Sequence, residues 1–225
     1  SINSKIFTIE IPLIGYFQVK NLLMSILAAL GCGLSENKIF RQLHKIKPVP
    51  GRLECVAIKK NNSRIVVDFA HTPDALEQSL IALKKQFNKN ILLVFGCGGE
   101  RDKKKRPIMG KIAKKYCRKV FVTDDNPRCE NPKKIRDAIL KTCKKVAVDI
   151  GNRKEAIITA INELRPNEIL LVSGKGHEDT QSYGNKIIKF SDKIIINQIL
   201  RKNKSFNQNT WTEEISKIAF NGKKI

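Results

Sequence analysis

Four short polar segments carry most of the side chains that could bind a ligand or promote a reaction. Each follows an apolar run, and they comprise residues 68–74, 96–107, 123–128 and 174–178. Carboxylates, guanidinium groups, imidazoles and glycines dominate them, a mixture that favours a charged, polar ligand. No Ser–His–Asp order stands out, and the three histidines show no metal-ligand spacing. The sequence therefore predicts a group of ligand-binding side chains, and neither a catalytic nucleophile nor a metal site.

The segment that ends at Arg128 has the composition expected of a site for a zwitterion. Asp124, Asp125 and Asn126 can accept hydrogen bonds from an ammonium group. Arg128 can bind a carboxylate through two parallel N–H···O bonds. Pro127 restricts the backbone between the amide and the guanidinium group. Taken alone, the same residues could instead form a salt-bridged turn.

The segment after residue 95 contains three glycines, which allow the backbone to approach a ligand closely. These glycines form neither GxGxxG nor the GxxxxGK[ST] phosphate loop, so this stretch alone does not indicate a nucleotide site. Arg101 is a candidate for a carboxylate or phosphate contact. The basic run Lys103–Arg106 is expected to be a solvated face.

The two remaining segments each admit two interpretations. Asp68 and His71 could hold a ribose hydroxyl or a phosphate, or they could be local helix caps. Gly174 and Glu178 belong to the string GKGHE, which combines backbone freedom with three titratable side chains. A glycine-rich anion-binding turn is the competing use of that string.

The elements that must position these segments alternate between strands and helices. Apolar runs predict strands at 53–59, 64–69, 90–95, 119–123, 146–149 and 168–173. Helix signals predict helices at 73–87, 107–117, 132–144, 153–164 and 192–200. Two of the strands, at 91–95 and 169–172, are apolar throughout, as is typical of a sheet covered by helices on both faces. We therefore expect an α/β fold with a mostly parallel sheet, whose ligands bind at the carboxyl ends of the strands.

The first 47 residues have a different pattern. We expect a strand at 5–11, an apolar helix at 18–30, and a second helix at 35–46 that Ser35 caps. Residues 47–51 contain two prolines, which remove hydrogen-bond donors and fix φ, so the segment cannot continue a helix. This segment is the predicted domain boundary.

Composition and charge restrict the class of protein. The net charge of +22 could attract nucleic acid or anionic lipid, but the basic residues are spread over the chain and do not alternate with aromatic ones. We therefore expect no specific nucleic-acid partner and no membrane partner. There is no run of about 18 apolar residues and no signal-peptide pattern, and the six cysteines form no CxxC pair. A cytoplasmic protein with reduced thiols is the prediction.

Taken together, five strings resemble the Mur ligases, specifically the MurE type. They are PVPGRLE at 48–54, VVDFAHTPDAL at 66–76, FGCGGERDKKKRPIMG at 95–110, VTDDNPR at 122–128 and SGKGHED at 173–179. They occur in the family's order, and the resemblance covers about residues 12–200. It implies a carboxyl-terminal, Rossmann-like, amino-acid-binding domain at 48–200. Residues 1–47 would be the end of the central ATPase domain, and 201–225 a tail or linker.

The resemblance also implies a reaction. ATP, with Mg²⁺, would phosphorylate the D-glutamate carboxylate of UDP-MurNAc-L-Ala-D-Glu, and an amine of meso-diaminopimelate would attack the acyl phosphate during peptidoglycan synthesis. The implied diaminopimelate contacts are Arg101, Asp125, Asn126, Arg128, Gly174 and Glu178. The implied ATP contacts are Asn21, Arg52, Asp68 and His71. No catalytic residue and no metal ligand is expected in this part of the family's sequence.

Two departures from the family pattern affect these expectations. Gln18 stands where the family usually has Asn, which concerns the adenine side of the ATP site. The chain also contains no GTxGKT-like phosphate loop and no counterpart of the N-terminal domain. We therefore expect no ligase activity from this polypeptide alone, and a separate chain that carries the other domains is a candidate partner.

Two other classes of protein are weighed against this one. A relative of folylpolyglutamate synthetase shares the three-domain plan, but DNPR and GKGHE argue against it. A non-catalytic basic binding module, derived from a ligase, is the other alternative. Titration with meso-diaminopimelate against L-lysine tests the amino-acid pocket, and the salt dependence of any DNA binding tests the basic module.

Overall fold

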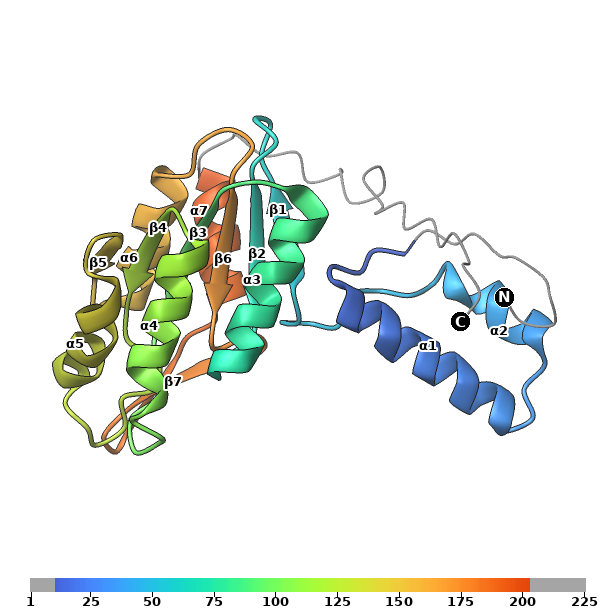
Figure 1. Cartoon of the computed structure of the whole chain (residues 1–225), viewed down its shortest axis with the longest axis horizontal. Helices are drawn as coiled ribbons and strands as arrows, with labels where there is room; N and C mark the ends of the chain where they lie inside the picture. Colours follow the sequence, from blue (N-terminus) through green and yellow to red (C-terminus); the bar gives the residue numbers. More distant parts are fainter. Residues whose placement is uncertain (1–10, 203–225) are drawn as a thin grey trace. The chain divides into compact units, whose positions relative to one another are not determined.

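The computed structural model describes residues 11–202, which fall into two compact units, one ending at Pro48 and the other starting at Val49 (Figure 1). The first unit contains α1 (Tyr16–Gly31) and α2 (Glu36–Leu43). Ser35 occupies the N-cap position of α2, but its side chain makes no capping hydrogen bond. The expected strand at 5–11 and the tail beyond 202 lie outside the described residues.

A six-stranded sheet forms the centre of the second unit. Its strands are β1 (Glu54–Ile58), β2 (Arg64–Asp68), β3 (Ile91–Phe95), β4 (Lys119–Val122), β5 (Ala147–Asp149) and β6 (Ile169–Ser173). Their order is β1-β2-β6-β3-β4-β5, and β1 is antiparallel to β2 whereas the remaining pairs are parallel. The expected mostly parallel sheet is confirmed.

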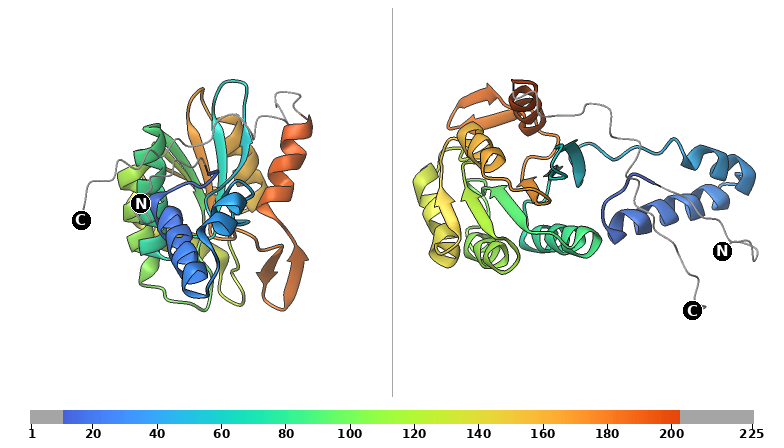
Figure 2. Two further views of the ribbon diagram at one scale, coloured as in Figure 1. Left: turned by 90° about the vertical axis from the view of Figure 1, so that its right-hand side faces the viewer. Right: turned by 90° about the horizontal axis from the view of Figure 1, so that it is seen from above.

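Helices cover both faces of this sheet. In Figures 1 and 2, α3 (Pro73–Phe87), α4 (Lys105–Tyr116) and α5 (Pro132–Cys143) lie on one face, while α6 (Arg153–Asn162) and α7 (Asp192–Lys202) lie on the other. Every residue of β3 and β6 is buried, which explains why both strands are apolar from end to end. Each fully buried Leu, Ile or Val contributes about 1.5–3 kcal/mol to this core.

Local signals fix where the helices start at the site end of the sheet. The Thr72 hydroxyl accepts a hydrogen bond from the Ala75 N–H at 3.3 Å, and Pro73 follows at the first helical position. Asn131 and Asn152 cap α5 and α6 in the same way. The polar segments that precede these helices are therefore held at a defined point.

One hairpin of this unit was not predicted, and two expectations about the unit were wrong. A hairpin of β7 (Thr180–Tyr183) and β8 (Lys186–Lys189) follows β6; its sequence is mostly polar and gives little apolar alternation. Helix α4 begins at Lys105, two residues before the expected Pro107, because proline is tolerated in a first helical turn. Arg106, the last residue of the basic run at 103–106, is buried, so this run is not a solvated face over its whole length.

Candidate functional site

The four polar segments meet at the carboxyl ends of the parallel strands, and glycines allow them to come this close. A Cβ at Gly99 would collide with the Pro127 carbonyl oxygen, and one at Gly174 would lie 2.6 Å from Asp125 Oδ2. A Cβ at Gly176 would lie 2.7 Å from the Phe69 Cβ. The glycines therefore serve loop-to-loop packing as well as any approach of a ligand.

A largely buried ion pair joins the second segment to Glu130, which lies two residues after the third segment. Arg106 donates to both carboxylate oxygens of Glu130 at 2.7 Å and to the Gly98 carbonyl at 3.3 Å. Glu130 also accepts a hydrogen bond from the Glu100 N–H at 3.3 Å. Hydrogen bonding from Arg106 lowers the pKa of Glu130 to about 2. This pair therefore fixes the glycine segment (residues 96–107) against the DNPR segment (residues 123–128).

Arg128 is held by its backbone and by one of its side-chain nitrogens. Its φ of 52° is left-handed, and its N–H donates to the Ser182 carbonyl at 3.1 Å. Its carbonyl accepts from the Gly184 N–H at 2.7 Å, so the hairpin holds this residue on both sides. Nη1 donates to the Gly99 carbonyl at 2.8 Å. Among residues 11–202, Nε and Nη2 have no protein partner, which leaves an edge of the guanidinium group for a carboxylate.

Arg101 lies beside Arg128. A Cβ at Gly98 would be 2.9 Å from Arg128 Nη1 and 3.7 Å from Arg101 Cγ, so both side chains pass over this glycine. Arg101 is exposed, and within the described part of the chain no hydrogen bond or ion pair engages its side chain. Both arginines therefore lie beside the same glycine, and guanidinium groups suit an anionic head group.

Asp125 and Asn126 of the third segment form an acidic and amide cluster with Lys175 and Glu178. Asn126 Nδ2 donates to Glu178 Oε2 at 3.1 Å, and Lys175 donates to the same oxygen at 3.1 Å. Asp125 is 6% exposed, and its Oδ1 lies 3.9 Å from Lys175 Nζ. This cluster bears two carboxylates and one ammonium group, so it has the charge to accept a ligand ammonium.

Asp124 does not belong to this cluster. Its carboxylate forms an ion pair with Arg136 and accepts a hydrogen bond from the Tyr183 hydroxyl at 3.0 Å. Burial, and then the neighbouring Asp124 charge, raise the pKa of Tyr183. Asp124 therefore forms the salt bridge that the sequence left open as an alternative, whereas Asp125 belongs to the cluster around Lys175.

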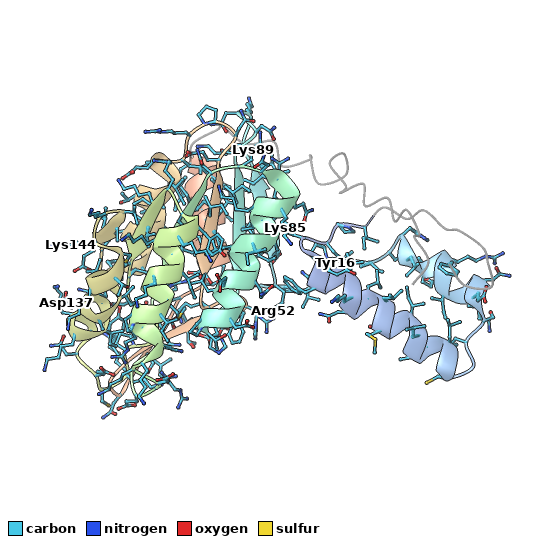
Figure 3. All side chains as sticks on the ribbon, viewed as in Figure 1. Tyr16, Arg52, Lys85, Lys89, Asp137 and Lys144 are labelled. Carbon is cyan, nitrogen blue, oxygen red and sulfur yellow. The ribbon has the colours of Figure 1, made fainter. Side chains whose placement is uncertain are left out.

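A second group of side chains surrounds Phe69. The Arg52 guanidinium lies 4.3 Å from the centre of this ring, and the imidazoles of His71 and His177 lie 4.7 Å and 5.3 Å from it. Figure 3 shows Arg52 at the end of the unit where α3 begins. His71 is exposed. These residues form a basic, aromatic surface that suits phosphate groups.

The other two candidates for the ATP site have different surroundings. Asp68 is 5% exposed and accepts hydrogen bonds from the Leu53 N–H at 3.1 Å and the Ser79 hydroxyl at 2.6 Å. It therefore holds Leu53, the residue between Arg52 and the first residue of β1, and is not a helix cap. Asn21 lies on α1 in the first unit, where its carbonyl accepts from the Ser25 hydroxyl.

The thiol of Cys97 is not activated. Burial raises the pKa of Cys97, which lies in the glycine segment, to about 12, so it is not a thiolate at neutral pH. Residues 11–202 contain no group of three or more His, Cys, Asp or Glu side chains that could hold a metal ion. Nor does any helix in this range have the length and apolar character needed to cross a membrane.

Sequence reasoning missed three parts of this arrangement. Lys175 is completely buried in the acidic cluster; its position between Gly174 and Gly176 was the signal available in the sequence. The partnership of Arg106 with Glu130 joins residues 24 positions apart, and no local pattern predicts it. The hairpin that binds Arg128 was missed because its strands are short and polar.

Comparison with known proteins gives consistent results. The family model described as "Mur ligase, glutamate ligase domain" matches residues 51–176. UDP-N-acetylmuramoyl-L-alanyl-D-glutamate–2,6-diaminopimelate ligase of Brucella melitensis is 44% identical over 191 residues, which are 85% of this chain and 39% of that protein. The enzyme of the same name from Bradyrhizobium diazoefficiens is 46% identical over 188 residues, 84% of this chain and 38% of that protein. The chain thus spans about two-fifths of the length of these relatives.

Solved structures agree with this assignment. A structure of a UDP-N-acetylmuramoyl-L-alanyl-D-glutamate–2,6-diaminopimelate ligase superposes with a TM-score of 0.67 at 33% identity, covering 88% of this chain and 41% of that one. Mycobacterium tuberculosis folylpolyglutamate synthase has a TM-score of 0.60 at 18% identity, over 73% of this chain and 38% of that one; it shares the fold. Because the family model matches more than half of its residues, the chain belongs to the Mur ligase family.

Proposed function

We propose that the second unit binds meso-diaminopimelate for an ATP-dependent ligase that adds this amino acid to UDP-MurNAc-L-Ala-D-Glu in peptidoglycan synthesis. The observation that carries the proposal is the free edge of the Arg128 guanidinium group, next to Arg101. The relatives named for this reaction, at 42–46% identity, support it.

The chemistry of the ligand explains the proposed selectivity. Diaminopimelate has two amino-acid head groups, so one can react while the other stays bound. Arg128 and Arg101 would take the carboxylate of the bound head group, and Asp125, Asn126 and Glu178 would take its ammonium group beside Gly174. L-lysine lacks that carboxylate. A charged hydrogen bond contributes about 1.5–3 kcal/mol, which corresponds to about 10- to 150-fold in affinity.

For ATP, the proposed contacts are Arg52 and His71 to the phosphates, with Asn21 of the first unit near the adenine. The cationic surface around Phe69 fits such a ligand. A ribose contact by Asp68 would have to use lone pairs beyond the two hydrogen bonds that this carboxylate already accepts. When bound, ATP and Mg²⁺ supply the phosphoryl group that activates the D-glutamate carboxylate.

The proposal extends to the rest of the chain. The first unit would be the end of the family's central ATPase domain, and the protein would act in the cytoplasm. Residues 1–225 contain no GTxGKT-like phosphate loop, so in this proposal they would act together with the family's other domains.

Calorimetric titration of the full chain with meso-diaminopimelate and with L-lysine tests the amino-acid site. We expect diaminopimelate to bind at least about tenfold more tightly, and Arg128→Met to remove this preference. Arg165→Met is the matched control, since Arg165 is exposed just before β6, at the opposite end of the strand from the site. Equal affinities for the two amino acids, or an unchanged preference in Arg128→Met, would refute the assignment.

A further inference from the structure

Lys175 is a completely buried cation next to the proposed amino-acid site. Its side chain is 0% exposed, although the residue lies in the turn that directly follows β6. Gly174 and Gly176 on either side have φ values of 114° and 55°, which L side chains rarely adopt. The two glycines therefore make a turn that directs the lysine between them into the protein.

All the hydrogen-bond donors of Lys175 are used inside the protein. Its ammonium group donates to Asn126 Oδ1 at 3.1 Å, to Glu178 Oε2 at 3.1 Å and to the Thr180 carbonyl at 2.7 Å. A lysine ammonium has three N–H donors, so none remains for a ligand. Lys175 therefore cannot itself bind a substrate group, and its effect must pass through its neighbours.

The first neighbour is the Asn126 side chain, whose orientation Lys175 determines. Asn126 Oδ1 accepts from Lys175 and also from the Ser182 N–H at 3.0 Å. Two donors at this position require the oxygen there, so the NH₂ group must point the other way, to Glu178. A rotated amide would place N–H groups against N–H groups.

The second effect of Lys175 is on the charge of the cluster. Asp125 and Glu178 lie 3.9 Å and 3.1 Å from the same ammonium group. With Lys175 the three side chains have a net charge of −1, which an incoming ligand ammonium would neutralise. Without it, the buried Asp125 carboxylate and the partly exposed Glu178 carboxylate would lose the counter-charge that they share. Because both cluster bonds to Glu178 use Oε2, Oε1 has no protein donor in the described residues.

We infer that Lys175 is a positioning residue: it fixes the Asn126 amide and the Glu178 carboxylate in the arrangement that receives the ammonium group of the amino-acid substrate. This inference rests on the proposed function for the identity of the ligand. The geometry of Asn126 and Glu178 around Lys175 is independent of it.

Lys175→Met tests this role in the full chain, because methionine keeps most of the aliphatic volume and removes the ammonium group. Lys111→Met, on the exposed face of α4, is the matched control. One readout is the affinity for meso-diaminopimelate by calorimetry. The other is the solvent-exchange rate of the Asn126 side-chain NH₂ group by NMR, which reports positioning without any ligand.

We expect Lys175→Met to lose at least about tenfold in diaminopimelate affinity and to accelerate exchange at Asn126, with Lys111→Met unchanged. A role in packing alone predicts wild-type values for Lys175→Met, and that result would overturn the inference. If this variant does not fold, the double variant Lys175→Met/Glu178→Gln removes the Glu178 carboxylate charge that Lys175 no longer balances. Slow exchange at Asn126 in the double variant would also overturn the inference. If the wild type binds no diaminopimelate, the proposed function fails, while the exchange rates still decide whether Lys175 positions Asn126.

Discussion

Replacing Glu130 by glutamine should reveal how strongly the glycine segment and the DNPR segment are held together. Glu130 accepts two hydrogen bonds of 2.7 Å from Arg106, whose side chain is 3% exposed. Glutamine keeps one acceptor but presents an NH₂ group to the other guanidinium nitrogen. Arg106 would then be a buried cation without its counter-charge, which is the costly way to break an ion pair.

The size of the effect follows from the shift in pKa. Hydrogen bonding from Arg106 lowers the pKa of Glu130 from 4.5 to about 2, which corresponds to about 3 kcal/mol before solvent screening. Because the Glu130 side chain is 17% exposed, we expect about 2 kcal/mol at neutral pH. The pKa is depressed in the folded state. The contribution is therefore complete above the ordinary pKa of 4.5 and is lost as the pH falls toward 2.

Urea unfolding of both proteins at several pH values between about 7 and about 3 measures this directly. The free energy of unfolding should differ by about 2 kcal/mol at neutral pH, and the difference should narrow below pH 4.5. Glu163→Gln is the control, because its ion pair with Lys119 is 29–36% exposed and should contribute about 0–1 kcal/mol. A difference that is absent at pH 7, or that stays constant down to pH 3, would refute the reasoning.

Three further substitutions test other parts of the structure by urea unfolding. Asp192→Asn should lower the free energy of unfolding by about 3–5 kcal/mol, because it leaves the fully buried Arg153 without its counter-charge; a loss under about 1 kcal/mol would contradict this. Asp68→Ala should cost about 2–4 kcal/mol, since two buried donors lose their acceptor, and wild-type stability would contradict that. Gly99→Ala should destabilise the protein and abolish diaminopimelate binding, whereas Gly31→Ala, with open space around it, should change stability by no more than about 1 kcal/mol. Retained binding in Gly99→Ala would show that the loop contact is dispensable.

Much of the second unit could be predicted because its strands and helices have strong local signals. The apolar runs at β3 and β6 reflect burial on both sides, and Thr72 with Pro73 sets the start of α3. The order of elements then places the polar segments at one edge of the sheet. The glycines, Arg101 and Arg128 of the candidate site lie in those segments, so sequence and topology together locate them.

The remaining features depend on contacts between distant segments. Arg106 looked like part of a solvated basic run, and only the position of Glu130 makes it a buried residue. Asp124 and Asp125 are adjacent and chemically identical, yet one pairs with Arg136 and the other with Lys175. The hairpin is held by its own strand pairing and by contacts with Asp124, Asn126 and Arg128, which lie in a distant segment, so no local pattern predicts it.

A crystal structure of the full chain with bound meso-diaminopimelate would test the central claim most directly. We expect a carboxylate of one head group about 2.7–2.9 Å from the nitrogens of Arg128, with the ammonium group of the same head group next to Glu178. If the ligand occupied a different part of the protein, or bound here with no oxygen within hydrogen-bonding distance of Arg128, the proposed basis of substrate selection would be wrong.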